Sequence, residues 1–365
     1  MKRLRIGLLG RILVAILLGI GAGYVMPVGC ARVFMTFNAV FSQFLGFLIP
    51  LIIVGFVVPA IAEIGSRAGR MLAVTALIAY GATLLSGFFS YFTGNWLFPD
   101  MITPGAVSEA DLSAADIAPY FTVAMPPLFG VMTALILSFL LGLGIAYSGS
   151  RVMKGWFEEL RVIVSKAIAS VIIPFLPVYI FGIFLNMTML GQVGTVLMTF
   201  LSIIAVIFVI HIAVLLIQYG IAGAVAGKNP FRMLWTMLPA YFTALGTQSS
   251  AATIPVTMAQ ARKAGVSSGI AGFVVPLCAT IHLSGSTLKI VACALALMIM
   301  QGQHYDTAMF AGFIAMLGVA MVAAPGVPGG AIMASLGVLS SMLGFSEADN
   351  ALMIALYIAM DSFGT

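Results

Sequence analysis

The sequence predicts an all-α integral membrane protein with about eight spanning helices and two re-entrant hairpins. Hydrophobic residues make up 62% of the 365-residue chain and charged residues only 7%, whereas soluble domains carry about 25% charged residues. The apolar runs reach about 20 residues, the length of a spanning helix, and lack the shorter alternating segments of a membrane β-barrel. Two late apolar runs are interrupted by glycine, proline and polar residues. Non-helical backbone inside a membrane is tolerated only where protein or water covers it.

The distribution of charge predicts how the chain crosses the membrane. Basic residues gather in alternate connections, at residues 2–11, 67–70, 151–166, 228–232 and 262–263. The connections between these basic ones are mainly acidic. The positive-inside rule therefore places the N-terminus in the cytoplasm and residues 100–127 outside, in an inner or plasma membrane. This asymmetry accounts for the net charge of +5 and indicates no nucleic-acid partner.

The expected spanning helices, in chain order, cover residues 6–26, 34–64, 70–98, 127–148, 156–187, 190–226 and 269–300. A final helix starts near residue 350 and reaches Thr365. A helix of that length extends about 24 Å, less than the roughly 30 Å of the hydrocarbon core, which predicts a truncated last helix. The 3 cysteines are an odd number and support no disulfide framework.

Two broken apolar segments predict hairpins that enter the membrane from opposite sides. The first covers residues 234–259, is split at residues 246–250 and has basic flanks, so it enters from the cytoplasm. The second covers residues 316–343, is split at residues 324–330 and has acidic flanks, so it enters from outside. An inverted repeat produces such a pair, and transporters of this kind bind substrate where the repeats meet.

Polar side chains deep in these segments are candidates for a binding site. Asp361 lies within an apolar span, where a carboxylate costs about 3 kcal/mol and usually faces a site. Its partner would be a substrate ammonium or a coupling cation; alternatively, it marks the polar end of a truncated helix. At the first hairpin tip, the Ser249 and Ser250 hydroxyls and the N–H groups of Ala251 and Thr253 can hold a carboxylate. The alternative for that tip is an exposed loop.

The helix at 269–300 and the second hairpin contain further candidates. His282, at a break in that helix, can titrate near neutral pH or bond a ligand, or it is buried with a satisfied hydrogen bond. Lys289 lies seven residues further on and can pair with Asp361 or supply a fixed positive charge. A gate, or alternatively a simple kink, is expected in the second hairpin at Gly326, Val327, Pro328, Gly329 and Gly330.

Two other classes of membrane protein fit the sequence less well. An intramembrane hydrolase needs a serine and a histidine within hydrogen-bonding reach, but His282 and Ser284 would point apart on one helix. An ion channel would line its pore with the hairpins, but no ring of like charges is present. A carrier, and not an enzyme, is therefore expected.

Four segments also carry a family resemblance: FLIPLIIVGFVVPAIAEI (47–64), LPAYFTALGTQSSAATIPVTM (238–258), PLCATIHLSGST (276–287) and GVPGG (326–330). They resemble the dicarboxylate/amino acid:cation symporter family, and the resemblance extends over nearly the whole chain. It implies the glutamate-transporter-like fold, a homotrimer in lipid, and an elevator mechanism in which a transport domain moves against a static scaffold.

The resemblance also implies a division of the chain and roles for its residues. Residues 1–69 would be scaffold helices, 70–98 a transport-domain helix, 99–189 an external loop with scaffold helices, and 190–365 the transport-domain core. Asp361 matches the residue that binds the substrate amino group, Ser250 matches a serine that faces the substrate carboxylate, and the second hairpin matches an extracellular gate. The implied substrate contacts are Ser249, Ser250, Ala251, Thr253, Ser286, Asp361, Gly364 and Thr365.

Departures from the family pattern concern the coupling ion and the substrate side chain. In the N-M-D-G-T motif, His282, Ser284 and Ser286 replace the Asn, Asp and Thr, so coupling to Na⁺ or to H⁺ stays open, with His282 a candidate proton carrier. The remaining candidates for cation binding or coupling are Tyr80, Thr83, Thr280 and Lys289.

Gly364 stands where members with acidic substrates have an arginine, and Gln248 replaces a hairpin arginine found in other members. A second substrate carboxylate would then be buried without a partner. A neutral amino acid is the expected substrate. An acidic amino acid or dicarboxylate paired with Lys289 is the alternative.

Overall fold

The computed structural model describes residues 8–66, 70–105, 117–191, 193–322, 324 and 329–365, and within these ranges it consists of helices joined by turns, without a strand. Helices long and apolar enough to cross a membrane cover Val28–Ala62, Ala73–Met101, Arg151–Met189, Phe200–Ala226 and Ser268–Gln301. Shorter apolar helices lie between them. The all-α membrane class expected from the sequence is confirmed.

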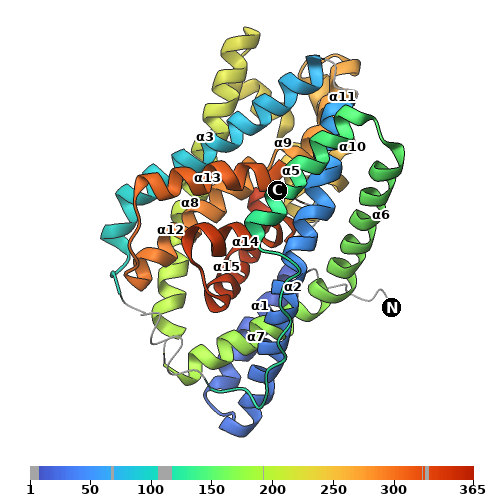
Figure 1. Ribbon diagram of the computed structural model, residues 1–365. Helices are drawn as coiled ribbons and strands as arrows, with labels where there is room; N and C mark the ends of the chain where they lie inside the picture. The colour runs from blue at the N-terminus through green and yellow to red at the C-terminus, as the bar shows by residue number, and fades with distance from the viewer. Residues whose placement is uncertain (1–7, 67–69, 106–116, 192, 323, 325–328) are drawn as a thin grey trace, which may run out of the picture.

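One group of helices packs around α2 (Val28–Ser66), which contacts α5 (Val131–Ser148), α6 (Arg151–Ala167) and α7 (Ile173–Met189) (Figure 1). The first helix, α1 (Leu8–Gly23), lies along α7. The single helix expected at residues 156–187 is longer and is divided by a π-helical turn at Ile168–Ile172. Because that turn adds a residue to the helical repeat, α6 and α7 run in different directions.

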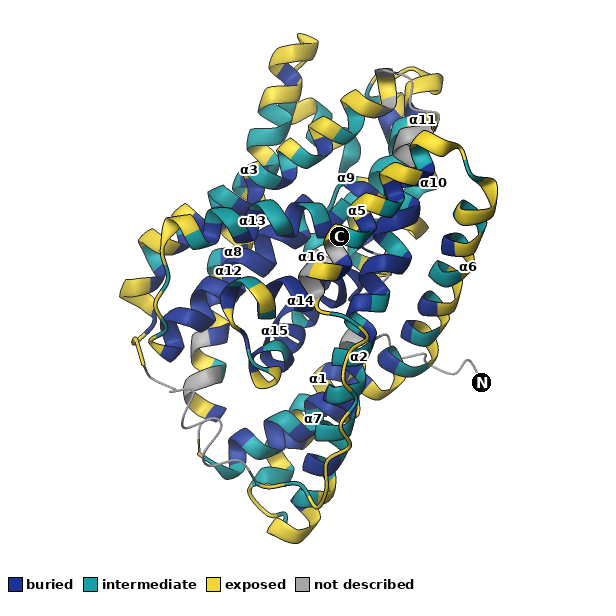
Figure 2. Ribbon diagram, in the orientation of Figure 1, coloured by how far each residue is buried: buried dark blue, intermediate teal, exposed yellow. Residues whose placement is uncertain are grey.

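A second group surrounds α12 (Ser284–Gln301), whose side chains are almost all buried. Its neighbours include α3 (Arg70–Met101), α8 (Val193–Ala226) and α15 (Glu347–Ala359). Figure 2 shows burial concentrated in α12, α14 (Gly330–Leu343) and α15. The outer helices instead expose large apolar side chains, such as Leu77 at 72% and Leu201 at 66%, as expected for surfaces that face lipid.

Both expected hairpins are present as pairs of short helices. The first pairs α9 (Pro230–Thr247) with α10 (Ser250–Lys263), and the second pairs α13 (Thr307–Val322) with α14. Two other spans are also interrupted. The α11 helix (Ser268–Ile281) ends before His282 and Leu283, and α16 (Asp361–Gly364) follows α15 after Met360.

The two groups meet mainly where α14 and α15 lie against α1, α2, α5 and α7. This contact contains cavities of about 260 and 210 Å³. Across it, the Gln43 side-chain amide donates a hydrogen bond of 3.1 Å to Glu347. The contact is thus less tightly packed and more polar than the α12 core.

Candidate functional site

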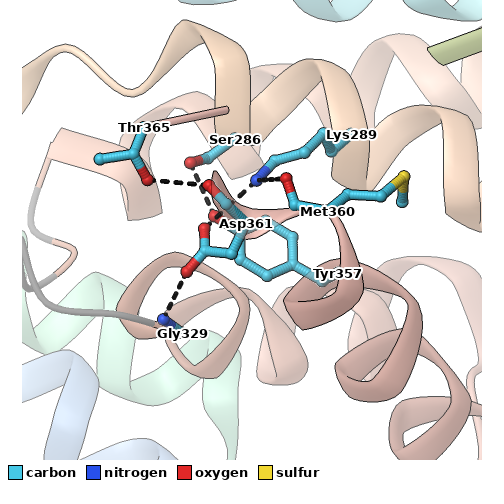
Figure 3. Close-up of polar contacts among 7 residues, drawn as sticks. All are labelled: Ser286, Lys289, Gly329, Tyr357, Met360, Asp361 and Thr365. Atoms are coloured by element: carbon cyan, nitrogen blue, oxygen red, sulfur yellow. Dashed lines mark hydrogen bonds and ion pairs between the residues drawn. The ribbon is translucent and has the colours of Figure 1, made fainter. Parts of the chain in front are cut away.

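The breaks in two helices bring Asp361 and Lys289 together inside the second group (Figure 3). Lys289 Nζ lies 3.2 Å from Asp361 Oδ1, and the two side chains are only 1% and 6% exposed. The other carboxylate oxygen, Oδ2, accepts a 2.8 Å hydrogen bond from the Gly329 N–H, at the start of α14. Helices α12, α14 and α16 therefore each contribute one group to this buried ion pair.

The Lys289 ammonium has two further neighbours on α15 and at its end. It donates a 3.4 Å hydrogen bond to the carbonyl oxygen of Met360, at the break between α15 and α16. It also lies 3.9 Å from the centre of the Tyr357 ring, a cation–π contact. The Tyr357 hydroxyl donates a 2.7 Å hydrogen bond to Ser286 Oγ, which fixes the ring on α12.

Glycine at position 364 makes room for this arrangement. A Cβ atom at Gly364 would overlap the Cε and Nζ atoms of Lys289. A Cβ at Gly285, on α12, would similarly overlap the Gly364 carbonyl oxygen and lie 3.1 Å from the His211 ring. The close approach of α12 and α16 thus depends on side-chain-free positions on both helices.

A cavity of about 560 Å³ lies beside the ion pair, between α8, the first hairpin and α11. Its lining includes four of the residues expected at the site: Ser250, Thr253, His282 and Thr365. Thr365 links the cavity to the ion pair, because its hydroxyl donates a 2.9 Å hydrogen bond to the Asp361 carbonyl oxygen. Most other lining residues are apolar, as in small-molecule sites generally.

The tip of the first hairpin is a turn of two residues. Gln248 adopts the left-handed conformation, with φ 53°, and caps the end of α9. Ser249 is the N-cap of α10: its side chain accepts a 3.3 Å hydrogen bond from the Ala252 N–H. The Thr253 hydroxyl donates to the Ser249 carbonyl oxygen at 2.8 Å. These hydrogen bonds within the tip hold it in place. Ala251 is exposed at the first turn of α10.

The expected cation or coupling residues are more scattered. Tyr80 donates a hydrogen bond to the Ala315 carbonyl oxygen on α13, and Thr83 donates to the Ala79 carbonyl oxygen within its own helix. Thr280 is exposed and bonded to the Leu277 carbonyl oxygen. Buried Ser284 accepts a 3.3 Å hydrogen bond from the Gln218 side chain on α8.

The described residues contain no cluster of three or more His, Cys, Asp or Glu side chains that would hold a metal ion. Of the expected gate, Gly326, Val327 and Pro328 lie outside the described residues. Gly329 and Gly330 are buried at the start of α14.

Sequence reasoning missed two groups at this site. Tyr357 lies four residues before Asp361, a spacing that places side chains on one helix face and was an available signal. His211, on α8, was not among the candidates. It is 7% exposed, and its Nδ1 atom has no hydrogen-bond partner in the described part of the chain. Its place beside Gly285 could not be read from its apolar surroundings in the sequence.

Paired hairpins, broken helices and a cavity beside a buried ion pair define a secondary transporter. The chain belongs to the sodium:dicarboxylate symporter family, whose model matches residues 8–365. It is thus a multi-pass membrane protein of the glutamate-transporter-like fold that carries out cation-coupled symport, and not an enzyme.

Curated relatives are amino acid transporters. The serine/threonine transporter SstT of Acinetobacter baumannii is 28% identical over 361 residues, which cover 94% of this chain and 88% of that protein. The transporter of the same name from Acinetobacter baylyi is 24% identical over 346 residues, covering 90% and 85%. The neutral amino acid transporter B(0) of Rattus norvegicus is 30% identical over 129 residues, covering 35% and 23%.

Proposed function

We propose that the protein imports a small neutral amino acid of the serine or threonine type through an inner or plasma membrane. The substrate ammonium would pair with Asp361. Its carboxylate would meet the first hairpin tip at Ser249 and Ser250, where it would be held with the N–H groups of Ala251 and Thr253 at the start of α10. Ser286, Gly364 and Thr365 would complete the substrate contacts.

The observation that carries this proposal is the charge balance at the site. Lys289 is the one buried Lys or Arg side chain in the described ranges, and Asp361 already neutralises it. A zwitterion brings one charge of each sign and suits such a site. A second substrate carboxylate would need a further buried cation, which supports a neutral substrate over an acidic one. The serine/threonine transporters among the relatives support the same choice.

For movement, we propose the elevator mechanism of a homotrimer whose N-terminus lies in the cytoplasm. Residues 1–69 and 99–189 would form the scaffold, and residues 70–98 and 190–365 would move as the transport domain. The separate packing of the α2 and α12 groups supports this division. The second hairpin would open and close the site from outside, at Gly326, Val327, Pro328, Gly329 and Gly330.

We propose Na⁺ as the coupling ion, on the basis of the family. Its ligands would be oxygens near Tyr80, Thr83, Thr280 and Ser284, together with backbone oxygens at the breaks in the helices. H⁺ is the second candidate, because His282 lies on the cavity wall and can exchange a proton with its contents.

The test is uptake of labelled serine by liposomes that contain the purified protein. Serine should accumulate under an inward Na⁺ gradient, and threonine and alanine, but not aspartate, should compete. Asp361→Asn should abolish uptake, whereas Asp306→Asn, a matched change at an exposed residue that caps α13, should not. Uptake of aspartate alone would exclude a neutral substrate. Accumulation under a pH gradient that is lost in His282→Gln would identify H⁺ as the coupling ion.

A further inference from the structure

The Asp361 carboxylate, which should receive the substrate ammonium, is already paired with the ammonium of Lys289. Lys289 Nζ lies 3.2 Å from Asp361 Oδ1, 3.4 Å from the Met360 carbonyl oxygen and 3.9 Å from the centre of the Tyr357 ring. A carboxylate, a carbonyl and an aromatic face are the groups that recognise a primary ammonium. Asp361 Oδ2 is bonded to the Gly329 N–H. An incoming ammonium must therefore take the place of Lys289.

The Asp361 carboxylate, the Met360 carbonyl and the Tyr357 ring form an ammonium subsite, which lies close to the cavity. Thr365 lines the cavity and hydrogen-bonds the Asp361 backbone, and its neighbour Gly364 abuts the end of the Lys289 side chain. The short α16 helix that carries these residues packs against α9 of the first hairpin. One turn of chain thus separates the ion pair from the space that a substrate would occupy.

A displaced Lys289 ammonium needs a new partner. Its side chain is 1% exposed, and an unpaired charge at such a position is strongly unfavourable. His211, which lies beside Gly285, offers no negative charge. An anion must therefore arrive together with the ammonium that displaces Lys289.

We infer that Lys289 is a tethered occupant of the ammonium subsite that selects zwitterionic substrates. The substrate ammonium replaces Lys289 at Asp361, and the substrate carboxylate, besides its contact with the first hairpin tip, becomes the new partner of the Lys289 ammonium. One internal ion pair is exchanged for two between protein and substrate. A simple amine brings no carboxylate and is rejected, and a simple carboxylic acid brings no replacement cation for Asp361. This inference rests on the proposed binding of an amino acid at Asp361.

The test compares ethanolamine, which has the ammonium and hydroxyl of serine but no carboxylate, with serine itself. The readout is the melting temperature of the full-length purified chain, which does not depend on transport. Serine should stabilise the wild type and ethanolamine should not. In Lys289→Ala, which vacates the subsite, ethanolamine should stabilise the protein saturably, at concentrations at least about tenfold below any that affect the wild type.

Two controls separate this effect from ionic strength. Tetramethylammonium, which has the charge but no N–H donor, should have no effect on any variant, and Lys289→Ala/Asp361→Asn should not respond to ethanolamine. An equal response of the wild type and Lys289→Ala, or a response that survives in the double variant, would overturn the inference. If Lys289→Ala does not fold, Lys289→Met, which keeps most of the volume, should let ethanolamine compete with bound serine.

The two proposals can fail separately. Amine responses as expected, in a protein that takes up no neutral amino acid, would leave the Lys289 subsite intact and refute the proposed substrate. Serine uptake as expected, with ethanolamine acting alike on every variant, would refute the role of Lys289 alone.

Discussion

Gly364 lies so close to Lys289 that a Cβ atom at residue 364 would overlap the end of the lysine side chain. Gly364→Ala should therefore push the ammonium away from Asp361 and destabilise the protein, by about 1–3 kcal/mol for an overpacked buried site. In Lys289→Ala the same change should cost much less, because the overlapping atoms are gone. Chemical unfolding in detergent measures both, and equal costs in the two backgrounds would show that Gly364 serves another contact.

Removing one partner of the Lys289–Asp361 ion pair should strongly destabilise the protein. Lys289→Ala leaves the Asp361 carboxylate buried without its cation, and breaking a buried pair in this way typically costs about 3–5 kcal/mol. The double variant Lys289→Met/Asp361→Asn removes both charges and should be more stable than Lys289→Ala. Lys154→Ala breaks the half-exposed Lys154–Glu158 pair and is the control, expected to cost less than about 1 kcal/mol. A double variant less stable than Lys289→Ala would contradict this account.

Tyr357 contributes through two separable contacts. Tyr357→Phe keeps the ring beside Lys289 but removes the hydrogen bond to Ser286, and should cost about 1–2 kcal/mol. Tyr357→Leu also removes the cation–π contact and should cost more. In a Ser286→Ala background, Tyr357→Phe should become nearly neutral. If it costs as much there as in the wild type, the hydroxyl has a different partner.

Two serines allow the helix-capping role of Ser249 to be distinguished from its proposed contact with the substrate. Ser249 caps α10 and Ser267 caps α11 with the same geometry, accepting from the Ala252 and Ile270 N–H groups. Ser249→Ala and Ser267→Ala should each cost about 1 kcal/mol of stability. Only Ser249→Ala should also raise the KM for serine uptake. Equal KM changes would mean that Ser249 acts only through the helix cap.

Much of the architecture could be predicted from local patterns. The first break was expected at residues 246–250 and occurs at Gln248 and Ser249; the break expected from His282 onward occurs at His282 and Leu283. The first break has a local cause, because Ser249 caps the N-terminus of α10. At the second break, neither His282 nor Leu283 is left-handed, and Leu283 has no side chain that can cap α12.

Helix limits were predicted less well. The α2 helix extends to Val28–Ser66, beyond the expected 34–64, and nothing in the apolar run at 168–172 signalled the π-helical turn. Both depend on the neighbours against which these helices pack, and a hydrophobic pattern does not specify those neighbours.

The sequence by itself determined the membrane class, the order of helices and hairpins, and the presence of one acidic and one basic side chain deep in apolar spans. It left the pairing of Lys289 with Asp361 as one option among several. The tertiary structure decided it, because the two residues lie 72 positions apart and meet only when broken helices pack closely. It also added groups that carry no sequence signature, such as the Gly329 N–H and the Met360 carbonyl. The physical reason is that a buried charge must find partners, and only the packed backbone determines which partners are within reach.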